Sequence, residues 1–315
     1  MLKLKYFCKM SNNLLFSFVL SLALGGSAVQ AQEQRFFLFA SGSVKGIYFP
    51  LAAHICKTIN RRALNRGLRC GLVATGGSVD NLKGVVSGDY AFAIVQSNLL
   101  RSNGAENEDQ PVKVVASLYP EPIHIVVREP SEIMTLSDLD GAIVNFGDEG
   151  SGTLSLAEAL MKAADLSVPP SHIRRFGASE QTAKICNGSL DALIWVSGLR
   201  NSAMSEAFNR CALRLIPLDE NVQQAMIRAD PSLELMQIPA GTYRTQERPV
   251  MTVGPYARIV ASENTSNALV GIVTETLLGS LSDVRQIHPT LRELSQTKLK
   301  SLFPGEELHS GASSD

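Results

Sequence analysis

The sequence predicts an α/β protein with two lobes, each built on a mostly parallel sheet flanked by helices and joined to the other by crossing strands. Short apolar runs alternate with segments of helical apolar spacing along most of the chain, which is typical of such sheets. The chain that follows the predicted leader is longer than a typical single α/β domain, and its length suits two lobes. Two extended segments, 112–128 and 250–261, are the expected crossings; the first is interrupted by prolines, as expected where a strand leaves one sheet for another, and the second alternates in hydropathy.

The first residues have the features of a secretory signal peptide. Lys3, Lys5 and Lys9 precede an apolar run over 14–24, and Val29-Gln30-Ala31 offers a cleavage site after Ala31. The run is shorter than the roughly 20 residues of a membrane span, and no cysteine stands at the cleavage point to carry a lipid. We therefore expect residues 1–31 to be removed and the mature protein to be periplasmic and soluble, not membrane-spanning.

Charge and cysteine content narrow the possible partners and the compartment. Removing the leader takes away three lysines and no acid, so the formal net charge changes from −1 to −4. This mildly acidic balance, without charged runs, argues against binding to nucleic acid or to an anionic membrane surface. Four cysteines remain, Cys56, Cys70, Cys186 and Cys211, and an even number in an oxidising compartment predicts two disulfides. Proximity favours Cys56–Cys70 and Cys186–Cys211, although three pairings are possible.

The first half of the chain repeats a strand, loop and helix unit. Strand 36–40 leads into loop 41–49 and a helix that begins near Pro50 and ends at Gly67. Apolar residues of this helix repeat every four positions, at Leu51, Ile55, Ile59 and Ala63. Strand 72–74 leads into loop 75–78 and helix 79–86, with Ser78 as a plausible N-cap. Strand 91–95 ends at Gln96-Ser97-Asn98, and the polar segment 101–110 is expected as a surface loop.

The second half continues the alternation after a crossing. Strands 112–119 and 123–128 are interrupted by Pro120-Glu121-Pro122, which predicts a passage between the lobes. The remaining expected elements are strand 142–146, loop 147–153, a helix from Leu154, a helix over 179–187, strand 192–196, a helix between the irregular segments 216–220 and 231–241, a second crossing over 250–261, a helix over 268–283 and a flexible tail over 305–315.

Four of the loops follow strands of the two predicted sheets, over 41–49, 75–78, 96–98 and 147–153. Ligands of open α/β sheets bind outside the carboxyl ends of the strands. Loops that open helices there direct free backbone N–H groups and about half a positive charge at whatever binds. We therefore expect the four loops to converge on one small anion.

The motifs of nucleotide binding and catalysis are missing from the sequence. Loop 147–153 lacks the Lys-Ser/Thr pair of a phosphate-binding loop, and Gly150-x-Gly152 has no third glycine of a dinucleotide motif. There is no H-E-x-x-H or G-x-S-x-G motif, and the five histidines are scattered. We expect no catalytic residue, no metal and no cofactor.

What remains is a set of neutral polar residues that suits binding without conversion. The polar candidates are Ser43, Thr75, Ser78, Asn81, Gln96, Ser151 and Thr153. Tyr48 and Trp195 could pack against an aliphatic stem, and Lys45, Arg200 or Arg244 could supply a countercharge. Each has a plainer alternative: Ser78 and Thr153 could only cap helices, Asn81 could be solvated, Trp195 could belong to the core, and the basic residues could lie at the surface.

Several segments together resemble the TAXI family, the substrate receptors of TRAP transporters (tripartite ATP-independent periplasmic). They are ASGSVKGIYFPLAAHICKTIN with LRC, ATGGSVDNLKGVVSGDYAFAIVQSN, SLYPEPIHIVV, NFGDEGSGT, IPAGTYR and DVRQIHP, in the family's order and spacing. The resemblance covers about residues 35–303. Matched by motif, it assigns ligand contacts to Ser41, Gly42, Ser43, Tyr48, Thr75, Gly76, Ser78, Asn81, Gln96, Ser97, Ser151, Gly152 and Thr153, and it supports both favoured disulfides.

The resemblance implies a two-lobed periplasmic binding protein, type II-like, that delivers a glutamate-, glutamine- or 2-oxoglutarate-like ligand to TRAP membrane permease subunits without ATP. Lobe I would comprise 32–121 plus 258–304, and lobe II 122–257. The chain departs from the family at Asn98, where many members have aspartate, at Glu149, where many have proline, and at Leu154, where many have a nearby base. These departures favour a zwitterionic amino acid over a dianion. A periplasmic sensor for a signalling partner and an enzyme on the same scaffold remain alternatives.

Overall fold

The computed structural model describes residues 35–62, 67–100 and 111–313. The predicted signal peptide 1–31 and the polar segment 101–110 lie outside the described residues.

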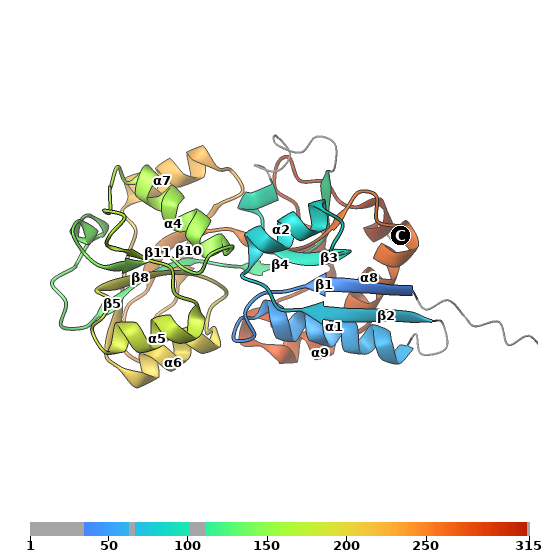
Figure 1. The fold of residues 1–315 in the computed structure, drawn as a ribbon, viewed down its shortest axis with the longest axis horizontal. Helices are drawn as coiled ribbons and strands as arrows, with labels where there is room; N and C mark the ends of the chain where they lie inside the picture. Colours follow the sequence, from blue (N-terminus) through green and yellow to red (C-terminus); the bar gives the residue numbers. More distant parts are fainter. Residues whose placement is uncertain (1–34, 63–66, 101–110, 314–315) are drawn as a thin grey trace, which may run out of the picture. The chain divides into compact units, whose positions relative to one another are not determined.

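Two five-stranded sheets form the framework of the described chain (Figure 1). The first has the order β2-β1-β3-β12-β4 and the second β7-β6-β8-β5-β9. The strands of the first are β1 Arg35–Ala40, β2 Leu68–Val73, β3 Phe92–Gln96, β4 Val112–Pro120 and β12 Tyr256–Ser262. Those of the second are β5 Ile123–Arg128, β6 Val144–Asn145, β7 Ile173–Arg174, β8 Ala192–Val196 and β9 Leu213–Ile216. A separate pair joins β10 Glu234–Ile238 to β11 Val250–Gly254.

Each five-stranded sheet is parallel except for one reversed strand. In the first sheet β12 runs antiparallel to both β3 and β4, and in the second β5 runs antiparallel to both β8 and β9. The chain enters the second sheet along β5 directly after leaving β4, and it returns to the first sheet along β12. The reversed strands are therefore the ones that follow a crossing. The prolines around Glu121 predicted the first of these crossings.

Helices flank both sheets, which confirms the predicted α/β class (Figure 1). Their bounds are α1 Tyr48–Arg62, α2 Ser78–Val86, α4 Gly152–Ala163, α5 Ala178–Cys186, α6 Ser202–Arg210, α7 Glu220–Ala229, α8 Asn267–Gly279, α9 Leu281–Ile287 and α10 Gln296–Leu299. Short 3₁₀ segments are η1 Leu136–Leu139, η2 Pro289–Leu291 and η3 Ser310–Ala312.

Apolar clusters lie on both faces of each sheet. On one face of the first sheet, Leu51 and Ile55 of α1 pack with Phe39 of β1, and Leu82 of α2 lies in the cluster of the opposite face. In the second sheet, Leu160 of α4 packs with Val144 on one face. The four-residue repeat read in the sequence of α1 is thus the buried stripe that attaches this helix to its sheet.

Several elements and one helix break differ from the sequence prediction. The sequence analysis did not find α6, α10, β7, β9 and β10, although α6 and β9 contain buried apolar residues such as Met204 and Leu213. Strand β10 is stabilised by pairing with β11. The helix expected over 268–283 is two helices, α8 and α9, that meet at Ser280. There the Oγ of Ser280 donates to the carbonyl of Thr276 at 2.7 Å, so this side chain takes part in ending α8.

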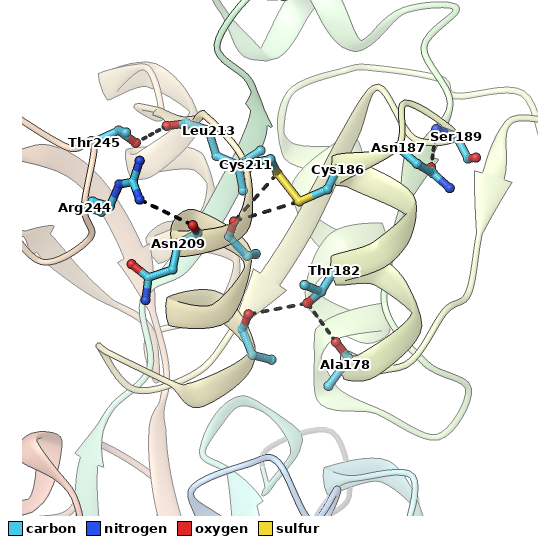
Figure 2. The surroundings of a disulfide bond; sticks show 12 residues. Ala178, Thr182, Cys186, Asn187, Ser189, Asn209, Cys211, Leu213, Arg244 and Thr245 are labelled. Carbon is cyan, nitrogen blue, oxygen red and sulfur yellow. Dashed lines mark hydrogen bonds between the residues drawn. A yellow bond between two sulfur atoms is a disulfide. The ribbon is translucent and has the colours of Figure 1, made fainter.

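Both favoured cysteine pairs are disulfides, Cys56–Cys70 and Cys186–Cys211. The first joins α1 to β2. Figure 2 shows the second joining the end of α5 to the residue after α6, beside a hydrogen bond from Thr182 back to Ala178 within α5. Each bridge thus fixes a helix to a neighbouring element, and the Cys186–Cys211 bridge supports α6, the helix that the sequence did not predict.

The C-terminal segment, expected from the sequence as a flexible tail, packs against the first sheet through its described residues. Leu308 forms a parallel bridge with Val114 of β4, and the N–H of His309 donates to the Val114 carbonyl at 2.8 Å. Ala312 is buried in the core cluster that contains α1. This edge of the sheet is therefore covered by the chain's own end.

Within the described residues, no helix combines the length and the apolar character that a bilayer crossing requires.

Candidate functional site

Loops at the carboxyl ends of strands from both sheets enclose one small cavity of about 100 Å³. The lining residues lie at the ends of β1, β2, β3, β4, β6, β7 and β8, and helices α1, α2, α4, α5 and α6 begin beside the cavity. The lining residues are Gly42, Ser43, Gly46, Ile47, Tyr48, Gly76, Gly77, Ser78, Gln96, Glu121, Asp148, Ser151, Gly152, Thr153, Ala178, Trp195, Val196, Ser197 and Asn201. This is the position at which open α/β sheets bind ligands.

A larger cavity, of about 540 Å³, lies along β4, β12 and the segment around 289–303. It contains none of the glycine- and serine-rich loops that follow the parallel strands. The smaller cavity is therefore the candidate site, because convergent polar groups matter more for recognition than volume.

Most of the predicted contact residues line the candidate cavity. They are Gly42, Ser43, Tyr48, Gly76, Ser78, Gln96, Ser151, Gly152, Thr153 and Trp195. The predicted residues that do not line it are Ser41, Thr75, Asn81 and Ser97.

Those four predicted residues make hydrogen bonds within and between the loops and do not line the cavity. Asn81 is fully buried and donates from Nδ2 to the Ile94 carbonyl at 2.7 Å and to the Ser41 carbonyl, and its Oδ1 accepts from the Thr75 hydroxyl at 2.6 Å. The Ser41 hydroxyl donates to the Val73 carbonyl at 2.8 Å. The Ser97 hydroxyl donates to the Ser232 carbonyl at 3.1 Å. Their hydrogen bonds hold the loops after β1, β2 and β3 in place.

The loops before α2 and α4 touch directly. The N–H groups of Val79 and Asp80 donate to the Gly150 carbonyl at 3.1 and 3.2 Å, so these first N–H groups of α2 are occupied by the protein itself. A Cβ on Gly77 would lie 3.1 Å from the Cα of Ser151, and the φ of Gly77 is 134°. The prediction that Ser78 caps α2 is wrong: Gly77 is the N-cap, because only glycine readily adopts this conformation.

The start of α4 is capped and still has donors to spare. Ser151 is the N-cap, and its Oγ accepts from the N–H of Leu154 at 3.2 Å. Thr153 does not cap the helix; its Oγ1 accepts from the N–H of Val196 at 3.3 Å. No partner within the described residues accepts from the N–H groups of Gly152 and Thr153, and these groups lie at the positive end of the helix dipole.

Glu121 places a carboxyl group in the cavity wall. Its side chain is 3% exposed, and its Oε2 accepts from the Tyr48 hydroxyl at 2.6 Å. Burial raises the pKa of Glu121 to about 7, although hydrogen bonds from Tyr48, from the Gln96 side chain and from the Gly198 N–H oppose that rise. Burial, and then the nearby Glu121 carboxylate, raise the pKa of Tyr48. At neutral pH the site thus holds a partly ionised acid.

Sequence reasoning assigned Glu121 only to the crossing and missed several other lining residues. Ser197 and Asn201 follow β8 just as the predicted loops follow their strands, and Trp195 donates from Nε1 to the Ser197 Oγ at 2.8 Å. The position of Ser197 after a predicted strand was the signal that could have found it. For Glu121, the feature of the sequence that could have pointed to the site was a single acidic residue between two prolines at the crossing.

No basic countercharge lines the cavity among the described residues. Lys45 pairs with Glu206 at 3.1 Å, Arg200 donates to the Gly241 carbonyl and Arg244 to the Asn209 carbonyl. Glu149, the acid that departs from the TAXI pattern, is exposed and pairs with Arg175 at 3.2 Å. Nor do the described residues contain a cluster of three or more acids, histidines or cysteines that could hold a metal ion.

Solved structures with the same architecture have very different ligands. The arginine-, lysine-, histidine-binding protein ArtJ from Geobacillus stearothermophilus matches with a TM-score of 0.53 at 14% identity, over 83% of this chain and 97% of that one. An ancestral arginine-binding protein bound to arginine matches at 0.52 and 13%, over 82% and 99%. A Xanthomonas citri protein bound to ATP matches at 0.53 and 12%, over 84% and 92%. These likenesses establish a two-lobed fold of the type II periplasmic binding protein kind.

The model of the NMT1-like family matches residues 39–314, which include every loop of the candidate site and both five-stranded sheets except the first residues of β1. The chain therefore belongs to the NMT1-like family.

Proposed function

We propose that this protein is an exported solute receptor that binds a small carboxylate or amino acid between two lobes and delivers it to membrane permease subunits of a TRAP-type transporter. The lobes are 32–121 with 258–304, and 122–257. The single observation that supports the proposal most is the composition of the cavity wall, because loops from the strand ends of both sheets contribute to it. A ligand held there touches both lobes at once, and this contact stabilises the closed arrangement.

The carboxylate subsite lies at the start of α4. The N–H groups of Gly152 and Thr153, which have no partner among the described residues, suit an anionic oxygen, and Ser43 and Ser78 line the same cavity. Closure moves the lobes about the Glu121 crossing and the β11–β12 return, and it excludes water from these hydrogen bonds. Titration calorimetry against amino acids and small carboxylates, after carried-over ligand is removed, tests the proposal. If the protein bound none of these compounds and instead converted a substrate to product, the result would contradict the proposal.

Gly152 lies at a close approach between loops of the two sheets. A Cβ there would lie 2.0 Å from the Oε1 of Gln96 and 3.2 Å from the Cβ of Ser78. Gly152→Ala is therefore expected to displace the Gln96 amide and hinder closure, so the Kd should rise by at least about tenfold, equivalent to about 1.4 kcal/mol. The measurement is titration calorimetry on the matched wild-type and variant proteins.

Gly271→Ala is the control for this experiment. Gly271 also lies in a helix, α8, and the nearest atom to its added Cβ would be 3.7 Å away, an ordinary contact. Both replacements add one Cβ to a helical glycine, so the control separates the effect of the contact at Gly152 from that of the glycine-to-alanine change itself. Equal affinities of the two variants would contradict the proposed role of Gly152.

The choice of transporter is tested by uptake in cells that depend on this receptor. A TRAP-type partner predicts that uptake stops when the transmembrane ion gradient is dissipated and continues when ATP hydrolysis is blocked with the gradient maintained. Uptake that follows ATP instead would reject the TRAP assignment and leave the receptor proposal intact.

A further inference from the structure

The charged groups of the candidate cavity are all acids. Glu121 and Asp148 line it, and no lysine, arginine or histidine does so among the described residues. Glu121 is held in place by the Tyr48 hydroxyl at 2.6 Å, by the Gln96 side chain and by the Gly198 N–H. A carboxylate fixed in a buried wall without a cation is costly unless a bound group supplies the opposite charge.

Gln96 adds a second acceptor beside that carboxylate. Its hydrogen bond to Glu121 turns Nε2 toward the carboxylate, so Oε1 points away from it, toward Gly152. Gln96 is 3% exposed and lines the cavity, yet its Oε1 has no donor. A buried acceptor without a donor is unfavourable, and a ligand N–H would satisfy it.

Asp148, the second acid of the cavity wall, lies near other carboxylates. Partial burial raises the pKa of Asp148, and the neighbouring carboxylates of Asp80, Glu149 and Glu180 raise it further. A cavity wall whose two charged residues are both acids attracts a cationic group and disfavours a dianion. The positive end of α4, with the N–H groups of Gly152 and Thr153, is the one part of the wall that suits an anion.

We propose that the cavity selects a small zwitterion whose ammonium group binds the Glu121 carboxylate and the Gln96 Oε1 while its carboxylate binds at the start of α4. The inference rests on the proposed receptor function and defines its ligand class. An ammonium has three N–H donors, so it can serve both acceptors at once. A dicarboxylate without an amine would bring a second negative charge to a wall that offers no base. The cavity volume of about 100 Å³ restricts the ligand to a small molecule.

The test compares molecules with the same carbon skeleton and different nitrogen content. L-alanine is compared with pyruvate and L-glutamate with 2-oxoglutarate, and L-glutamine is included as a neutral zwitterion. Binding is followed by titration calorimetry and by the fluorescence of Trp195, the single tryptophan of the chain, which lines the cavity. We expect the amino acid that binds to do so at least tenfold more tightly than its 2-oxo analogue.

A matched pair of variants assigns the preference to one carboxylate. Glu121→Gln should weaken amino acid binding at least tenfold and leave 2-oxo acid binding equal or stronger. Glu149→Gln makes the same chemical change at an exposed acid paired with Arg175, and it should change either affinity less than twofold. The wild-type comparison stands by itself if Glu121→Gln fails to fold.

The outcomes separate this inference from the receptor proposal. Equal or tighter binding of the 2-oxo acids by the wild-type protein overturns the inference and leaves a carboxylate receptor. An unchanged amino acid affinity in folded Glu121→Gln also overturns it. Binding of no amino acid and no carboxylate of the panel overturns the receptor function itself, and the inference with it.

Discussion

Replacement of Glu306 by alanine is expected to lower the free energy of unfolding by about 3–5 kcal/mol, because it leaves a buried arginine without its partner. Arg258 lies in β12 with a side chain that is 2% exposed, and Glu306 is 1% exposed. The Arg258 Nε donates to both carboxylate oxygens at 3.1 and 3.2 Å, and its Nη2 donates to Oε2 at 3.1 Å.

The other printed contacts of the Arg258 guanidinium are with neutral groups. Its guanidinium carbon lies 5.4 Å from the ring centroid of Tyr256 and 4.9 Å from that of Phe303, and its Nη1 donates to the Ser117 hydroxyl. These contacts orient the guanidinium but carry no negative charge, so they offset only part of the lost ion pair. Urea unfolding followed by Trp195 fluorescence measures the change.

The adjacent residue provides the control. Glu307 is exposed and pairs with Lys113 at the surface, so Glu307→Ala should lower the free energy of unfolding far less than Glu306→Ala. The paired replacement Arg258→Met with Glu306→Leu should destabilise less than Glu306→Ala alone, since it leaves no buried charge unpaired. Equal costs for the Glu306 and Glu307 variants would show that the buried pair does not hold the C-terminal segment to the sheet.

His124 is expected to make the protein sensitive to acid. Its imidazole is fully buried beside the crossing, with Nδ1 2.8 Å from the Pro122 carbonyl and Nε2 2.9 Å from the Tyr243 hydroxyl. Burial lowers the pKa of His124 to about 4, against hydrogen bonds to Pro122 and Trp195 that favour the charged form. The folded protein thus keeps this ring neutral well below the pKa of about 6.5 that it has in the unfolded chain.

The sign of the effect follows from proton uptake. Below about pH 6.5 His124 becomes protonated in the unfolded chain but stays neutral in the folded protein, and this difference lowers the free energy of unfolding. The contribution of His124 to stability is therefore complete only above about pH 6.5. It is lost progressively as the pH falls to about 4, and the total loss is roughly 3 kcal/mol at 1.36 kcal/mol per pKa unit. Glu121 acts in the opposite direction: its pKa of about 7 means that its contribution falls as the pH rises from about 4.5 to 7.

A variant separates the two groups. His124→Asn retains an N–H donor near the position of Nδ1 and does not titrate. The stability advantage of the wild-type protein over this variant should shrink by roughly 3 kcal/mol between pH 7 and pH 4, and Glu121 contributes equally to both proteins. Urea midpoints measured at several pH values provide the data. A difference that stays constant with pH would contradict the assignment to His124.

The sequence predicted correctly those strands and helices whose own residues show a clear apolar pattern. Strand 192–196 has the predicted bounds, and the apolar repeat of α1 gave the buried face of that helix correctly. Prolines around Glu121 gave the crossing, because a missing N–H excludes mid-sheet pairing wherever the chain folds. Elements that are stabilised by pairing with another segment were not predicted. Strand β10 is an example, because its partner β11 begins only at Val250.

The sequence by itself determined the alternation of strands and helices, the glycine- and serine-rich loops after the strands and the supply of four cysteines, because each is written in neighbouring residues. Only the tertiary structure decided which groups meet in the cavity. Glu121, Gln96 and Gly152 are distant in sequence and meet only when the two sheets come together. Folding then places the Glu121 carboxyl in the cavity wall, leaves the Gln96 Oε1 without a donor and brings Gly152 close to Gln96. Burial and the distance between remote groups fix a pKa and a ligand preference, and neither quantity is a property of a local stretch of chain.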